Sequence, residues 1–160
     1  MPLNNLYAAG PLLLAKIRAG TTSADFAFVK DEDAFSSEQD IGPLMDGVGG
    51  CVVADNGAKM AEFQIEGQYA EIQSWHVIVV VPWNGAATGT SNSKMLAGPK
   101  LVKLIQLLQN LHISADFDEP LELNNDRPPA QYPNYQGRPF GYGAFILEFN
   151  QRITVQTTTC

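Results

Sequence analysis

The sequence predicts an α+β domain, in which a mostly antiparallel β-sheet is packed by two main α-helices and joined by long loops. Three observations predict it. Large apolar residues alternate through a β-branched run, Gln73 to Trp83, which is typical of a central strand. Apolar residues with helical spacing follow from Leu101 to Leu111. A second clean alternation runs from Phe145 to Val155. A helix with one apolar stripe lying on such strands forms the core of an α+β domain.

The composition is that of one folded domain. The chain has 160 residues, of which 45% are hydrophobic and 17% charged, and its net charge is −7. We expect a core over residues 6–155, with 156–160 as a flexible tail. The negative charge argues against a nucleic-acid clamp and against binding to an anionic membrane. No apolar run approaches the roughly 20 residues that span a bilayer, so we expect a cytoplasmic protein with Cys51 and Cys160 as thiols.

The first third predicts a helix, a short strand and a long loop. Apolar spacing favours a helix from about Asn5 to Ala19, which Pro11 either kinks or delays to position 10 or 11. Phe26 to Val29 then forms a short extended segment. The acidic, glycine-rich stretch from Asp31 to Gly50 is expected to be a long surface loop.

A hairpin is expected next. Cys51 to Ala54 has the composition of a strand, and Asp55-Asn56-Gly57 has the chemistry of a positive-φ turn. Lys59 to Ile65 would then be the returning arm. The long strand follows, apolar on both faces at its centre, and Pro82 marks where regular pairing stops.

Two further loops flank the second helix. Residues 83–93 are mostly small and polar, and Ser91 or Ser93 is placed to cap the helix. A short strand is expected around Leu121 to Leu123. Residues 124–143 carry several prolines among aromatic residues, which excludes a regular element there.

No residue pattern indicates an enzyme. His76 lies in a strand without a nucleophile nearby in the sequence, and His112 is explained by its place at a helix C-terminus. Asp116, Asp118 and Glu119 lack the spacing of a calcium loop. The glycines at 47, 49 and 50 precede a strand, whereas a phosphate loop follows one. We therefore expect no catalytic residues, no cofactor and no metal.

The proline- and aromatic-rich segment is the candidate interaction surface. Tyr, Phe and Arg are enriched at the centres of protein interfaces. The candidate subunit-interface residues are Arg127, Tyr132, Tyr135, Arg138, Phe140 and Tyr142. The alternative is a loop that folds back over its own core.

The order of elements resembles a family of phage proteins. A first helix interrupted by proline precedes a hairpin, the strand SWHVIVVVPW (Ser74–Trp83), a Leu-rich helix and the closing strand GAFILEFNQRITV (Gly143–Val155). Together they are similar to the tail terminator, or gateway, subunits of Mu-like and other contractile-tailed phages. The resemblance covers about Leu6 to Val155 and lies in the style and order of elements.

The resemblance implies a structural virion protein of the tail or neck, assembled in the host cytoplasm. Six copies would form a ring that ends the tail tube, contacts tube, sheath and head–tail connector proteins, and leaves a channel for DNA. An acidic channel lets DNA pass without holding its phosphates. The candidate channel-lining residues are Glu62, Glu66, Glu71, Asp116, Asp118 and Glu119.

Two alternatives remain at this point. The first is a head–tail connector or tail completion protein. The second is a small-ligand-binding or enzymatic domain that uses His76 and nearby carboxylates.

Overall fold

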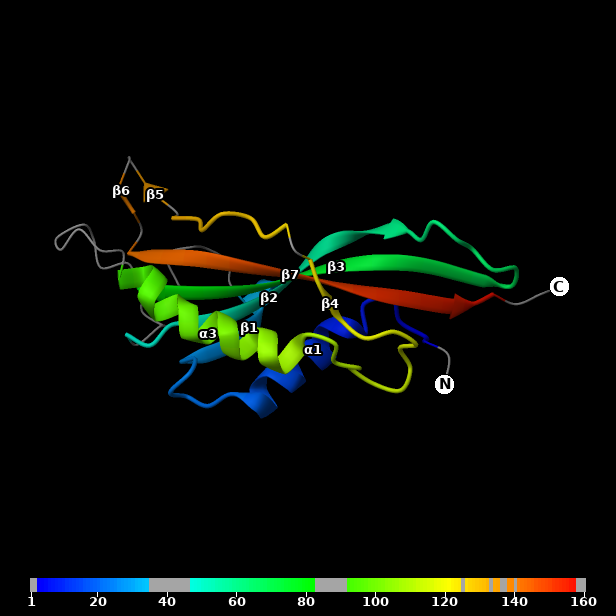
Figure 1. Cartoon of the computed structure of the whole chain (residues 1–160), viewed down its shortest axis with the longest axis horizontal. Helices are drawn as coiled ribbons and strands as arrows, with labels where there is room; N and C mark the ends of the chain where they lie inside the picture. The colour runs from blue at the N-terminus through cyan, green and yellow to red at the C-terminus, as the bar shows by residue number, and fades with distance from the viewer. Residues whose placement is uncertain are drawn as a thin grey trace.

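The computed structural model describes residues 3–34, 47–82, 92–124, 126–132, 134–135, 138–139 and 141–157. Two helices, a short 3₁₀ helix and seven strands follow one another in this part of the chain (Figure 1). In order they are α1 (Ala9–Gly20), β1 (Phe28–Asp31), η1 (Glu32–Ala34), β2 (Gly50–Met60), β3 (Gln68–Pro82), α3 (Asn92–Leu108), β4 (Glu122–Leu123), β5 (Asn134–Tyr135), β6 (Arg138–Pro139) and β7 (Tyr142–Gln156).

The sheet confirms the predicted α+β class. Five strands lie in the order β1-β2-β3-β7-β4, and β5 and β6 form a separate small hairpin. Only the β1–β2 pair of the five-stranded sheet is parallel, and the other three pairs are antiparallel.

Strands β3 and β7 form the long axis of the molecule. They pair without a register shift from Gln68 opposite Gln156 to Pro82 opposite Tyr142. Strands of 15 residues rising about 3.3 Å per residue extend about 50 Å. We call the two ends of this pair the Gln68 end and the Pro82 end. The predicted long strand is confirmed, and it begins five residues earlier than Gln73.

Both helices cover the same face of the sheet (Figure 1). Alternate residues of β3 and β7 point into this layer, where they meet apolar residues of α1 and α3. The buried cluster includes Trp75, Val77, Val79, Leu147 and Phe149 from the strands and Leu13, Ile17, Leu104 and Leu108 from the helices. Cys51 belongs to this core, and its burial raises the pKa of the thiol to about 12.

The opposite face changes character along its length. Toward the Pro82 end it is apolar, with Phe28, Val52, Val80, Tyr142 and Ala144 forming a second buried cluster. Toward the Gln68 end it carries Ser74, Glu148, Asn150 and Arg152. The expectation that the middle of the long strand is apolar on both faces is therefore confirmed.

The predicted turn at Asp55-Asn56-Gly57 is wrong. Strand β2 continues through these residues to Met60, and the register shifts there because Asp55 pairs with Trp75 while Ala58 pairs with Gln73. The extra residue makes a β-bulge, in which Gly57 adopts a φ of +90°. The chain reverses later, between Ala61 and Gly67.

The helix boundaries also differ from those expected. Helix α1 begins at Ala9 and takes Pro11 into its first turn, where a missing N–H costs no helical hydrogen bond. Helix α3 ends at Leu108, three residues before the expected Leu111, because Asn110 adopts a φ of +61°. Pro99 lies inside α3.

Some expectations fall outside the described residues. They include most of the acidic loop (35–46), the small-residue loop (83–91), Phe140 and the tail from 158 with Cys160. The strands β1 and β4 are confirmed close to their expected places.

Candidate assembly surfaces

The β2–β3 turn has a defined shape. Gln64 Nε2 donates to the carbonyl oxygens of Ala61 (2.9 Å) and Ala70 (2.8 Å), and its Oε1 accepts from the Ala70 N–H (2.9 Å). The Gln68 N–H also donates to the Ile65 carbonyl oxygen at 2.9 Å. One side chain thus satisfies backbone groups on both sides of the turn and holds the loop closed.

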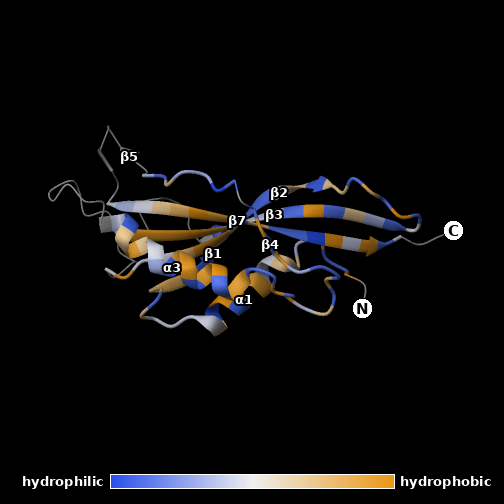
Figure 2. Ribbon diagram, viewed as in Figure 1, coloured by the Kyte–Doolittle hydropathy of each residue, from blue (hydrophilic) through white to orange (hydrophobic). Residues whose placement is uncertain are grey.

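The same turn exposes large apolar side chains. Met60 is 64% exposed, Phe63 80% and Ile65 62%. Figure 2 shows hydrophobic residues in the turn, beyond strand ends that are largely hydrophilic. Glu62 and Glu66 are exposed beside them. We call residues 60–67 the hairpin tip, an apolar projection flanked by carboxylates.

A second acidic loop follows α3. Asp116, Asp118 and Glu119 are all exposed, while Phe117 between them is buried in the core. Gln151 Nε2 of β7 donates to the Glu119 carbonyl oxygen at 2.9 Å, and Arg152 Nε lies 3.8 Å from Glu119 Oε1. Because both contacts come from the second half of β7, this loop lies toward the Gln68 end.

Glu71 differs from the other five candidate channel residues. It is only 8% exposed, and its two carboxylate oxygens accept hydrogen bonds from Tyr69 Oη and Gln73 Nε2, both at 2.8 Å. The bond to Glu71 raises the pKa of the Tyr69 phenol. Glu71 therefore has little surface to offer a channel in this conformation.

The candidate interface residues that the structure describes lie toward the Pro82 end. Tyr142 is only 3% exposed, and half-buried Tyr132 packs edge-on against Phe145 with ring centroids 6.2 Å apart. Tyr132 Oη also lies 3.4 Å from Ser93 Oγ. Both tyrosines contribute to their own core, as the alternative of a loop folded back on itself expects. Arg127 remains exposed, and the side chains of Tyr135, Arg138 and Phe140 lie outside the described residues.

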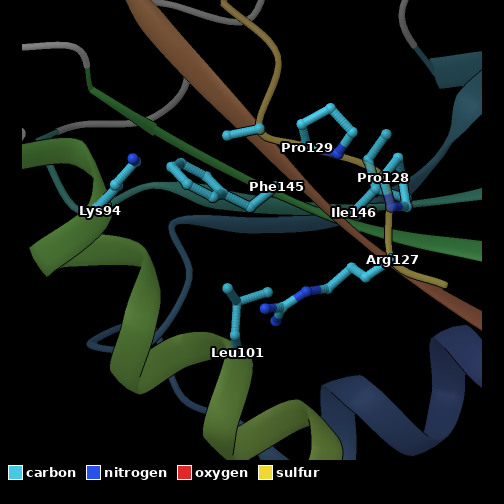
Figure 3. Close-up of a pocket in the computed structure, with 8 residues that line it drawn as sticks. Lys94, Leu101, Arg127, Pro128, Pro129, Phe145 and Ile146 are labelled. Atoms are coloured by element: carbon cyan, nitrogen blue, oxygen red, sulfur yellow. The ribbon is translucent and has the colours of Figure 1, made fainter. Parts of the chain in front are cut away.

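Arg127 borders a pocket of about 380 Å³ between α3 and the edge of β7 (Figure 3). The segment that carries it runs beside β7, where Gln131 and Ala144 exchange two backbone hydrogen bonds of 2.8 and 2.7 Å. Figure 3 shows Arg127 extending from this segment toward Leu101 of α3. We call this hollow the Arg127 pocket, lined by Lys94, Leu101, Arg127, Pro128, Pro129, Ala130, Phe145 and Ile146.

A polar cluster lies on the helix-free face around Glu148. One of its carboxylate oxygens accepts from Ser74 Oγ and, at 3.4 Å, from Asn56 Nδ2 of the bulge. The other accepts from Asn124 Nδ2 at 3.0 Å. The cluster ties the bulge, β3, β7 and the end of β4 together.

His76 lies directly opposite Glu148 in the β3–β7 register. Glu148 accepts hydrogen bonds from Ser74, Asn56 and Asn124, so the Ser74 hydroxyl is bonded to a carboxylate and not to an imidazole. Activation of a serine nucleophile requires an adjacent base such as histidine. Within the described ranges, no group of three or more His, Cys, Asp or Glu side chains is arranged to hold a metal.

The hairpin tip was not predicted from the sequence. Residues Lys59 to Ile65 were expected to form the returning arm of a hairpin, whereas Met60 ends β2 and Phe63 and Ile65 lie in the turn. The usable signal was Gly67, whose φ of +80° permits the real reversal.

In the part of the chain that the structure describes, no helix is long and apolar enough to cross a bilayer. No family model matches the chain, and the comparison with curated proteins gives no match.

Proposed function

We propose that this protein is a structural subunit of a phage tail, which assembles into a ring as a tail terminator. The proposal combines the resemblance in the order of elements with one observation on the folded chain. Two unlike exposed surfaces lie in opposite halves of a long, regularly paired sheet: the acidic and apolar hairpin tip beyond the Gln68 end, and the basic Arg127 pocket toward the Pro82 end.

This separation is what repeated self-association requires. A ring forms when one patch of each copy contacts a different patch of the next copy and the rotation closes. A two-fold dimer instead uses one patch twice. Unlike surfaces at the two ends of one chain therefore favour an assembly with more than two members.

The exposed carboxylates fit a channel for DNA. Glu62, Glu66, Asp116, Asp118 and Glu119 lie in two loops toward the Gln68 end. Acidic groups repel phosphates, whereas a basic lining would hold DNA through counterion release. We propose that Asp116, Asp118 and Glu119 face the central opening. Glu71 is buried, and Glu62 and Glu66 belong to the hairpin tip, which we treat as a contact surface between copies.

The test is the oligomeric state of the purified chain and its binding to tail tubes. Size-exclusion chromatography with light scattering and negative-stain images should show rings, alone or at tube ends. A chain that stays monomeric at all concentrations and binds neither tube nor sheath would contradict the proposal. Cross-linking to portal components in place of tube protein would instead favour a head–tail connector or completion protein.

A further inference from the structure

We propose that the hairpin tip of one copy inserts into the Arg127 pocket of a second copy. Phe63 and Ile65 enter the apolar part of the pocket, while Glu62 and Glu66 face its cations. This inference rests on the self-association in the proposed function and adds the contact that carries it.

The tip is preorganised for insertion. Three hydrogen bonds between the Gln64 side chain and backbone groups, two donated and one accepted by Gln64, fix the loop before any partner arrives. A contact made by an already ordered loop avoids most of the entropy cost of ordering on binding. Phe63 and Ile65 are 80% and 62% exposed, so the tip carries apolar surface that a partner would remove from water.

The pocket suits an apolar side chain. Leu101, Phe145 and Ile146 contribute apolar surface, and Pro128 and Pro129 form one wall (Figure 3). Its volume of about 380 Å³ lies within the range of pockets that take ligands larger than one side chain. A buried phenylalanine removes about 150–250 Å² from water, so Phe63 would act as the anchor of the contact.

The charges are complementary. Lys94 and Arg127 border the pocket, and Glu62 and Glu66 flank the two apolar residues of the tip. Within the described residues, none of these four side chains has an ion-pair partner. Opposite charges around an apolar centre orient two surfaces and speed their association.

The occupant is a second copy because the chain cannot reach its own pocket. The tip extends from the Gln68 end, whereas the pocket is lined by Phe145, near the Pro82 end of β7. Some ten paired residues, at about 3.3 Å each, separate them. The carboxylates beside Phe63 and the net charge of −7 disfavour an anionic lipid surface as the occupant.

Complementary mutants test the contact directly. Phe63→Ser inactivates the tip and Arg127→Glu inactivates the pocket, and neither residue is buried. We expect each variant alone to stay monomeric at a concentration where the unmodified chain assembles. An equimolar mixture should stop at a 1:1 dimer, because only one tip and one pocket remain intact in each pair. Met95→Ser, at a residue 76% exposed on α3, is the matched control and should assemble normally.

Charge reversal gives a second readout. Glu62→Lys combined with Glu66→Lys should weaken assembly at least tenfold, and adding Arg127→Glu to the same chain should restore it, because every contact then carries the two charges exchanged. Far-UV circular dichroism checks that each variant is folded.

The outcomes separate the two proposals. Rings that form equally well with Phe63→Ser or Arg127→Glu would overturn this contact and leave the proposed ring intact. Loss of tube binding by Phe63→Ser, with self-assembly unchanged, would assign the tip to the tube protein and also overturn it. A chain that never self-associates would overturn both.

Discussion

The ring of Phe28 lies against Gly50 of the neighbouring parallel strand, and a Cβ built on Gly50 would be 2.2 Å from Phe28 Cζ. No real Cβ is found at that distance, so the ring occupies the space that a side chain on Gly50 would need. An aromatic residue that covers a glycine in the neighbouring strand shields the backbone there. Phe28 also belongs to the second buried cluster, on the face of the sheet opposite to the helices.

Gly50→Ala should therefore destabilise the fold through overpacking. We expect the free energy of unfolding to fall by about 1–3 kcal/mol, the usual cost of forcing an extra methyl into a packed site. Urea unfolding followed by circular dichroism measures it. In a Phe28→Leu background the same substitution should cost less, and an equal cost in both backgrounds would refute the steric explanation.

Gln64→Ala should open the hairpin tip without unfolding the domain. Three hydrogen bonds are lost, each with a net value of about 0.5–1.5 kcal/mol, and all lie in one exposed turn. Amide hydrogen exchange should accelerate at Ala70, whose N–H donates to Gln64 Oε1. Glu66→Ala, in the same turn, is the control, and unchanged exchange at Ala70 in the Gln64 variant would contradict the assigned role.

Glu148→Ala should destabilise the bulged half of the sheet. The substitution leaves Ser74 Oγ and the Asn124 amide without their acceptor, and an unsatisfied part-buried group costs about 1–3 kcal/mol. Glu122→Ala, at an exposed residue of neighbouring β4, should change stability by no more than about 0.5 kcal/mol. Equal effects of the two substitutions on the urea midpoint would show that the cluster contributes nothing.

Asp25 should make stability depend on pH in the acid range. The hydrogen bond from Lys103 Nζ, at 2.5 Å, is the main cause that lowers the pKa of this carboxyl, followed by the Thr22 N–H. A carboxyl with a lowered pKa in the folded state stabilises the fold above its unfolded pKa and loses that contribution as pH falls through the folded value. Stability should therefore fall below about pH 4, the ordinary range of an aspartate.

Asp25→Asn should flatten that part of the pH profile. The variant should be less stable than the unmodified chain at pH 7, and the difference should shrink as the pH falls below 4. Thermal unfolding between pH 2 and 7 measures both curves. Parallel curves would show that another carboxyl dominates the acid response.

The long elements were predictable because their patterns are long. Fifteen-residue strands give many alternating positions, and the helix that carries Leu104 and Leu108 gives two full turns of apolar spacing. The order of the elements and the mostly antiparallel sheet followed from them.

Turn chemistry misled the hairpin assignment. Asp55-Asn56-Gly57 supports a two-residue turn and a bulge equally, because both need a residue with positive φ. What decides between them is pairing with β3, a long-range contact that local composition does not contain. The same error hid the hairpin tip, since Lys59 to Ile65 were assigned to a strand and not to the turn.

Burial separated the predicted surface residues. Glu71 and Glu62 are the same type of residue, yet they differ in the fold. Glu71 accepts hydrogen bonds from Tyr69 and Gln73, whereas Glu62 is exposed. Tyr132 and Tyr142 likewise turned inward, while Arg127 stayed accessible. Such differences depend on which neighbours the fold brings together, and no spacing rule gives them.

The uninterrupted pairing of β3 with β7 makes each molecule a strut of nearly constant length. Fifteen consecutive cross-strand pairs join the two strands without a register shift, so the extended backbone sets the distance between the two ends of the pair. In copies joined tip to pocket, that strut would determine the perimeter of the assembly, and the angle between tip and pocket would determine how many copies close it.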